Sequence, residues 1–170
     1  MVRTARLPRT KFVVPAILLV LAGTLVVNVM MAGPRTPPAL LGASASLYGG
    51  LARIQGVVPT EADGWTPPAP SLPLANPPGE ELHRVRILLE LTAMEPGGLS
   101  FDPSDYAVSA LGMGKWKVIW SSPAPVAARQ GESINATLVF DLPDRAIDLT
   151  LELPGGPGLS LGAGHHRRGG

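Results

Sequence analysis

The stretch HRVRILLELTA, His83–Ala93, decides the fold, because apolar residues recur in it at every second position. Successive side chains of a β-strand point to opposite faces, so this alternation predicts a strand with one buried face and one exposed face. Leu88 is the one apolar residue that falls on the exposed side. The side chains that we expect in the core are those of Val85, Ile87, Leu89, Leu91 and Ala93.

The same period of two continues toward the C-terminus. ESINATLVFDL at 132–142, DYAVSALG at 105–112, KWKVIWS at 115–121 and AIDLTLEL at 146–153 all alternate, and LARIQGVV at 51–58 also reads as a strand. Gly, Pro and Asp turns separate these segments, and none of them has the period of an amphipathic helix. Six strands of this kind predict an all-β, antiparallel β-sandwich. The further residues expected to face the core are Tyr106, Val108, Ala110, Trp116, Val118, Trp120, Ile134, Ala136, Leu138, Phe140, Leu142, Ile147, Leu149, Leu151 and Leu153.

Charge divides the chain of 170 residues into two parts. Residues 1–11 carry four bases and no acid, whereas residues 34–170 carry the other 10 bases and all 13 acids, a net of −3. A nucleic-acid-binding domain needs a basic surface, so the acidic balance argues against nucleic acid as a partner. The chain has no cysteine, which excludes disulfides, thiol nucleophiles and lipidated cysteine.

An uncharged run, FVVPAILLVLAGTLVVNVMM, follows the basic segment from Phe12 to Met31. Twenty residues of helix at about 1.5 Å each span roughly 30 Å, the thickness of the hydrocarbon core of a bilayer. We therefore predict a transmembrane helix over 12–32, in contact with the lipid bilayer, and the positive-inside rule places residues 1–11 in the cytoplasm and the C-terminal domain outside. The alternative is a cleaved signal peptide, for which the run is long and Ala43-Ser44-Ala45 is the better small-x-small match.

Proline and glycine set the expected boundaries of the parts that follow. Residues 33–46 predict a stalk, 47–156 the extracytoplasmic sandwich, and 157–170 a flexible tail rich in Gly, His and Arg. Within the sandwich, the Pro-rich stretch at 59–80 contains Trp65 and predicts a long loop between two strands. The alternative is a polyproline ligand for another protein.

Two stretches, LSFDPSDYAVSALG at Leu99–Gly112 and QGESINATLVFDLP at Gln130–Pro143, resemble the bacterial telokin-like family of immunoglobulin-like sandwiches, whose function is unknown. The resemblance implies an immunoglobulin-like fold, a tether in a Gram-positive or actinobacterial envelope, and no catalytic residues. Scarce lysine beside abundant Ala, Gly, Pro, Arg and Leu is also typical of the GC-rich codons of actinobacteria.

No residue combination predicts catalysis. The three histidines are His83 and the adjacent pair His165-His166, and no GxSxG turn accompanies them. We predict no enzyme, no cofactor and no catalytic, cofactor-binding or metal-binding residues. Three alternatives stay open: a metal site at His165-His166, contact of Arg167 and Arg168 with anionic lipid, and a carbohydrate platform at Trp116 and Trp120.

The expected function is that of a non-enzymatic protein-interaction module, tethered in the cell envelope, with an envelope or membrane protein as its partner. The alternative functions are binding or sensing of a small ligand or metal outside the cell, and service as an accessory subunit of a transport or secretion complex. In the last case Thr24 and Asn28, one helical turn apart, would contact a partner helix.

Overall fold

The computed structural model describes residues 37–61, 64–68, 71–111 and 114–163. The basic segment 1–11, the predicted transmembrane segment 12–32 and the His165-His166 tail lie outside these ranges. Among the described residues, no helix combines the length and the apolar character that crossing a membrane requires.

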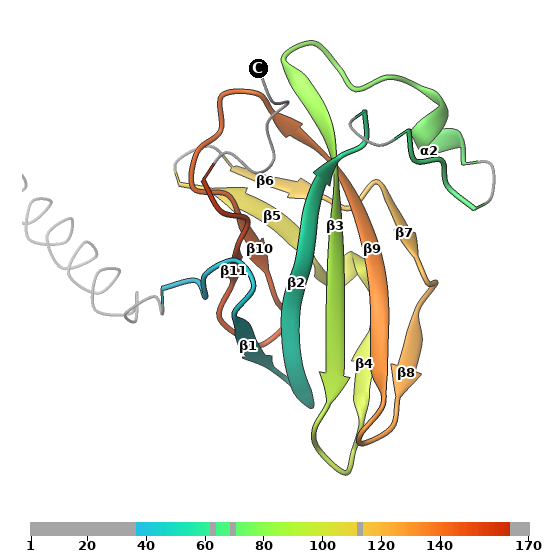
Figure 1. Ribbon diagram of the computed structural model, residues 1–170, viewed down its shortest axis with the longest axis vertical. Coiled ribbons are helices and arrows are strands. Elements are labelled where there is room, and N and C mark those ends of the chain that lie inside the picture. The colour runs from blue at the N-terminus through green and yellow to red at the C-terminus, as the bar shows by residue number, and fades with distance from the viewer. Residues whose placement is uncertain (1–36, 62–63, 69–70, 112–113, 164–170) are drawn as a thin grey trace, which may run out of the picture. The chain divides into compact units, whose positions relative to one another are not determined.

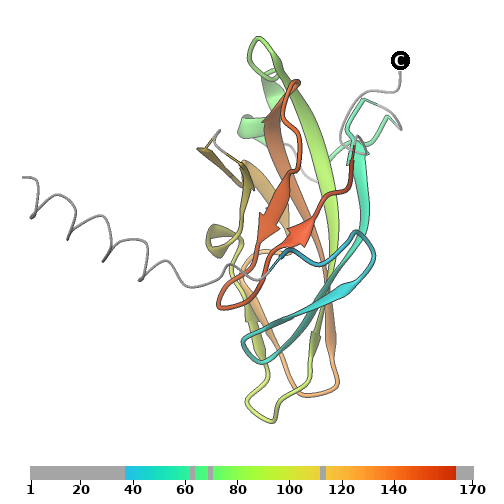
Figure 2. The same cartoon turned by 90° about the vertical axis from the view of Figure 1, so that its left-hand side faces the viewer.

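The described part of the chain is mostly β, and its antiparallel sheets form a β-sandwich, as predicted (Figure 1). The first sheet has the order β1-β2-β3-β9-β7, and the second has the order β11-β10-β5-β6. A small ribbon, β4-β8, accompanies them. The view in Figure 2 separates the two layers, with β2 and β3 on one side and β5 and β6 on the other.

The strands of the first sheet are β1 (Ser44–Leu47), β2 (Gly50–Pro59), β3 (Leu82–Ala93), β7 (Trp120–Ser122) and β9 (Ser133–Pro143). The second sheet contains β5 (Ala107–Ala110), β6 (Gly114–Lys117), β10 (Thr150–Glu152) and β11 (Leu159–Ser160). The ribbon is β4 (Leu99–Phe101) with β8 (Val126–Ala128). Two short helices lie in loops: α2 (Leu72–Ala75) and the 3-10 turn η1 (Pro103–Asp105).

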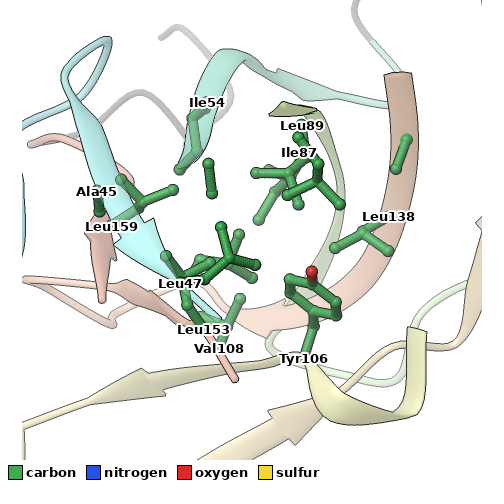
Figure 3. Close-up of a cluster of buried hydrophobic side chains, with 14 of the residues drawn as sticks. Ala45, Leu47, Ile54, Ile87, Leu89, Tyr106, Val108, Leu138, Leu153 and Leu159 are labelled. Carbon is green, nitrogen blue, oxygen red and sulfur yellow. The ribbon is translucent and has the colours of Figure 1, made fainter. Parts of the chain in front are cut away.

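The alternation in β3 and β9 predicts their buried residues correctly. All five predicted core residues of β3 are at most 1% exposed, and those of β9 are at most 7% exposed. These two strands pair along their length, from Leu82 opposite Pro143 to Thr92 opposite Ser133. They form the centre of the first sheet and one wall of the core (Figure 3).

Two residues expected in the core lie elsewhere. The prediction that Trp120 faces the core is wrong, because the chain crosses from the second sheet to the first between β6 and β7. At this crossing the Ile119 N–H donates to the Val139 carbonyl at 2.9 Å. Trp116 packs against the core, whereas Trp120 pairs with Val139 on the outer face of the first sheet. The prediction that Ile147 faces the core is wrong as well. Asp148 has a φ of +54°, which breaks the alternation and leaves Ile147 64% exposed.

The sandwich also extends beyond the limits expected for it. Ser44, inside the expected stalk, begins β1, and Ala39 is hydrogen-bonded to the strand β11 through Gly158 and Ser160. At the other end, Leu159 and Leu161 are at most 1% exposed, although the tail was expected from residue 157. The alternation did not predict these segments, because β1 lies among the small residues of the expected stalk and β11 has only two residues.

Candidate functional surface

The outer face of the first sheet, which points away from the core, carries an unusual row of side chains. Strand pairing places Val58, Arg86, Val139 and Trp120 directly beside one another across β2, β3, β9 and β7. Outward side chains of a sandwich usually meet water, yet Arg86 is only 7% exposed and Val139 is completely buried. Another part of the chain must therefore cover this row.

The cover is the Pro-rich connection between β2 and β3. We call its described residues, 64–68 and 71–81, the strap. The strap includes α2 and runs beside the upper ends of β9 and β7 (Figure 1). The strap therefore lies in the connection between β2 and β3 and contains the four-residue helix α2.

Arg84 on β3 attaches the strap to the sheet. Its Nε and Nη2 donate to the two carboxylate oxygens of Asp141 on β9 at 2.7 and 2.9 Å, while Nη1 donates to the carbonyls of Leu74 at 3.2 Å and Asn76 at 2.9 Å. The fork-shaped guanidinium thus bonds β9 with one edge and the strap backbone with the other. Arg84 is 9% exposed, so these bonds replace the water that a buried charge would otherwise need.

A stack of aromatic and cationic groups makes the second attachment. The Arg86 guanidinium lies 4.5 Å from the centre of the Trp65 ring, and Trp65 meets Trp120 edge-on at 5.4 Å between ring centres with a 68° interplanar angle. A cation over an indole ring and an edge-to-face pair of rings are both attractive arrangements. Trp65 therefore joins the strap to β3 and β7 together.

The strap buries little of itself. No residue of α2 is buried, Trp65 and Leu74 remain partly exposed, and Leu72 is 87% exposed. The strap is consequently held by a few directed contacts rather than by an apolar layer of its own.

The other half of the same face is open and polar. Glu90 Oε2 accepts hydrogen bonds from Arg53 Nε at 3.1 Å, Arg53 Nη2 at 2.7 Å and Gln55 Nε2 at 2.6 Å. The Thr92 and Ser133 hydroxyls bond each other at 3.0 Å. A shallow groove here is lined by Ser44, Leu51, Ala52, Arg53, Glu90 and Thr92.

The sequence predicts no catalytic centre around the three histidines. Of these, only His83 lies in the described part of the structure. Its Nδ1 lies 2.9 Å from Asp144 Oδ1 at the start of β3. Among the described residues, no group of three or more His, Asp or Glu side chains is arranged to hold a metal ion. The tail pair His165-His166 lies outside the described residues.

One polar group is buried between the sheets. Tyr106 is 1% exposed, and in the described structure its hydroxyl has no hydrogen-bond partner. Figure 3 shows the hydroxyl oxygen pointing in among apolar side chains that include Leu138 and Ile87. Burial raises the pKa of Tyr106, with a smaller contribution from the nearby Asp105 carboxylate.

Sequence reasoning did not find the strap surface. Arg84 and Arg86 alternate with core residues, so the period assigns them to a solvent-exposed face. In the sequence, Trp65 stands out only as part of a Pro-rich stretch. The available signal was the combination of two arginines on one strand face with a tryptophan in the preceding loop, since both residue types favour stacked contacts.

Comparisons with known proteins assign the chain to no family. No family model matches the chain, and no curated protein matches it. Among solved structures, it is similar to an uncharacterized beta-sandwich protein from Clostridium difficile 630, at 8% sequence identity and a TM-score of 0.44. That similarity covers 75% of this chain and 96% of the other.

Proposed function

We propose that the chain is a single-pass membrane protein whose extracytoplasmic, immunoglobulin-like sandwich binds another protein of the cell envelope and catalyses no reaction. The outer face of the first sheet is the binding surface. The observation that carries the proposal is the Pro-rich strap, which Arg84 fixes beside an open half of the same face.

Strand order supports the immunoglobulin-like assignment. In that fold the two sheets have the orders ABED and GFC, with an additional C′ beside C in some domains. Naming β2, β3, β5 and β6 as A, B, C and C′, and β7, β9, β10 and β11 as D to G, reproduces both orders. Within this scheme β1 and the β4-β8 ribbon are additions.

Sequence supports the membrane location. The uncharged run and the four bases before it favour a helix over 12–32 with residues 1–11 in the cytoplasm. Only residues 33–38 separate that segment from Ala39, the first residue hydrogen-bonded to the sandwich. We therefore infer a membrane protein, or a protein close to the membrane, as the partner.

The strap supports protein binding over other roles. Leu72 and Pro73 are exposed on the strap, and Arg84 already holds the neighbouring carbonyl of Leu74. Because the segment is already ordered, a partner that binds it loses less conformational entropy. The adjoining polar half offers hydroxyl, guanidinium and carboxylate groups suited to the rim of an interface.

Site-specific photo-crosslinking in the native membrane tests this function. A photoreactive residue replaces Leu72 on the strap or Thr92 on the open half, and the same residue at Lys117, exposed on β6 of the other sheet, is the control. We expect the same heavier product from positions 72 and 92 and none from position 117. Recovery of the chain alone from all three positions would refute the proposal.

The groove on the open half favours a second candidate, binding of a small polar ligand. Three donors converge on Glu90 Oε2, and Ser44 and Thr92 line the same groove. Calorimetry of residues 37–170 with soluble cell-wall fragments, copper and zinc tests this candidate. Heat that disappears in a Glu90→Gln variant would support the groove, and no heat with any of them would remove it.

A further inference from the structure

The strap occupies a surface that has the features of a peptide-binding site. This surface consists of Arg84 and Arg86 on β3, Val139 on β9 and Trp120 on β7. Building on the proposed interaction function, we propose that the strap is an internal ligand. When the strap is displaced, the surface beneath it binds a proline-containing segment of the partner protein, in which a short turn is followed by extended backbone.

The first reason is the chemistry of the contacts with Arg84. Its Nη1 donates to two carbonyls two residues apart, those of Leu74 and Asn76, and to no side chain of the strap. Backbone carbonyls are present in every sequence, and a proline-rich segment leaves them free because it has few N–H groups to bond them. Arg84 therefore recognises two carbonyls at the end of a helical turn, where the backbone becomes extended at Asn76, rather than the side chains of this particular strap.

The second reason is the way in which Trp65 packs against the sheet. The ring lies against the Arg86 guanidinium and meets the edge of Trp120. Aromatic rings bind cations such as this guanidinium, and proline rings pack on indole surfaces, which is how proline-rich peptides dock in aromatic grooves. An incoming segment needs one such ring and, at the distance of Leu74 and Asn76, two backbone carbonyls at the end of a turn to satisfy both attachments.

The third reason is the composition of the covered surface. A permanent cover would rest on aliphatic side chains, as the inner face does at Ile87 and Leu89. Here two arginines and a tryptophan accompany the aliphatic Val58 and Val139, and the arginines and the tryptophan tolerate water when the cover leaves. The strap, which buries no residue of α2, can therefore leave without disturbing the core.

The strap has one advantage over any competitor, because its attachment to β2 and β3 gives it a high effective concentration. A free peptide is expected to bind weakly to the unaltered chain and better to a chain whose strap is loosened. Trp65→Ala loosens the strap and leaves the core residues of the sandwich unchanged.

Hydrogen exchange of the purified full chain in detergent tests the proposal in two steps. In the Trp65→Ala variant, backbone amides of 71–82 are expected to exchange at least tenfold faster, while those of Leu89 and Leu91 keep their protection. The probe is then a synthetic peptide with the sequence of residues 64–81. It is expected to slow exchange along 84–86 and 120–122 in the variant, and a matched peptide with alanine in place of tryptophan is expected to bind at least tenfold more weakly.

Several results would overturn the internal-ligand proposal. Unchanged exchange of 71–82 in Trp65→Ala would show that the stack does not hold the strap. Equal binding of the two peptides, or no binding of either, would show that the covered surface is no peptide site. If Trp65→Ala loses exchange protection throughout the sandwich, Trp65→Phe replaces it as the test variant, because it keeps an aromatic ring at this position. The strap amides of Trp65→Phe must then exchange faster than those of the unaltered chain, or the proposal fails. No membrane partner enters these measurements, so their failure is distinct from a failure of the crosslinking experiment.

Discussion

The two halves of the outer face of the first sheet handle the same kind of ion pair in different surroundings. Arg84 and Asp141 lie in the strapped half, with side chains 10% and 21% exposed, whereas Arg53 and Glu90 lie in the open half, with side chains 46% and 27% exposed. Both arginines lie on central strands of one sheet, and both bond a carboxylate on the neighbouring strand. The difference is the strap, which removes water from one pair and leaves the other in contact with it.

The comparison shows that the free-energy cost of removing one partner of an ion pair depends on the surroundings of the charge that remains. Removing one partner of a buried pair leaves a charge with neither water nor a counter-ion, which is costly. Removing one partner of an exposed pair leaves a charge that water solvates, which costs little. The four variants below break or sharpen this contrast.

Arg84→Ala is expected to have the largest effect, a loss of about 3 kcal/mol in the free energy of unfolding. The substitution leaves the Asp141 carboxylate without its guanidinium and also releases the carbonyls of Leu74 and Asn76. Urea denaturation of residues 37–170, followed by circular dichroism, measures the loss. A loss below about 1 kcal/mol would show that water reaches this pair through the strap.

Trp65→Ala is expected to cost about 1 to 2 kcal/mol, since it removes the contact with Arg86 and the edge-on contact with Trp120. The same denaturation experiment measures the loss. Leu72→Ala on the same strap is the matched control, because Leu72 is 87% exposed and its removal should change stability by less than about 0.5 kcal/mol. Equal losses in the two variants would contradict the role of the stack.

The sequence predicted the centre of this sheet well and the strap poorly, for a physical reason. Core positions such as Leu89 and Leu138 follow from the local period of two, because the pleat alone decides which face a side chain takes. The burial of Arg84 depends on Asp141, 57 residues away, and on a loop whose path no local pattern determines. Trp120 was misplaced for a related reason, since the crossing between sheets resets the alternation.

The Tyr106 hydroxyl represents a third environment for a polar group. It lies in the core and lacks hydrogen bonds of the kind that Arg84 makes with the strap. Tyr106→Phe is expected to stabilise the sandwich by about 1 kcal/mol at neutral pH, because it removes a buried hydroxyl that has no hydrogen-bond partner among the described residues. Urea denaturation at pH 7 measures the gain. Loss of stability in the Phe variant would indicate that the hydroxyl is bonded in solution, for instance to a buried water.

The same substitution gives a pH test with a defined sign. Burial raises the pKa of Tyr106, so the folded state favours the neutral phenol. This contribution is fully present below the pKa of an unfolded tyrosine, about 10, and is lost as the pH rises above it. The unaltered sandwich should therefore lose more stability than Tyr106→Phe between about pH 9 and pH 11, and parallel losses would contradict the assignment.

Arg53→Ala is expected to have the smallest effect, about 0.5 kcal/mol, because water solvates Glu90 once the guanidinium is gone and Gln55 Nε2 still donates to Glu90 Oε2. Salt separates the two halves of the face further. Raising the ionic strength from about 0.05 to 1 M shortens the screening length to about 3 Å, so the cost of Arg53→Ala should approach zero. The cost of Arg84→Ala should persist under the same conditions, because ions in solution do not reach the covered pair. Equal salt dependence of the two costs would mean that the strap does not exclude solvent, and the distinction between the two halves would be lost.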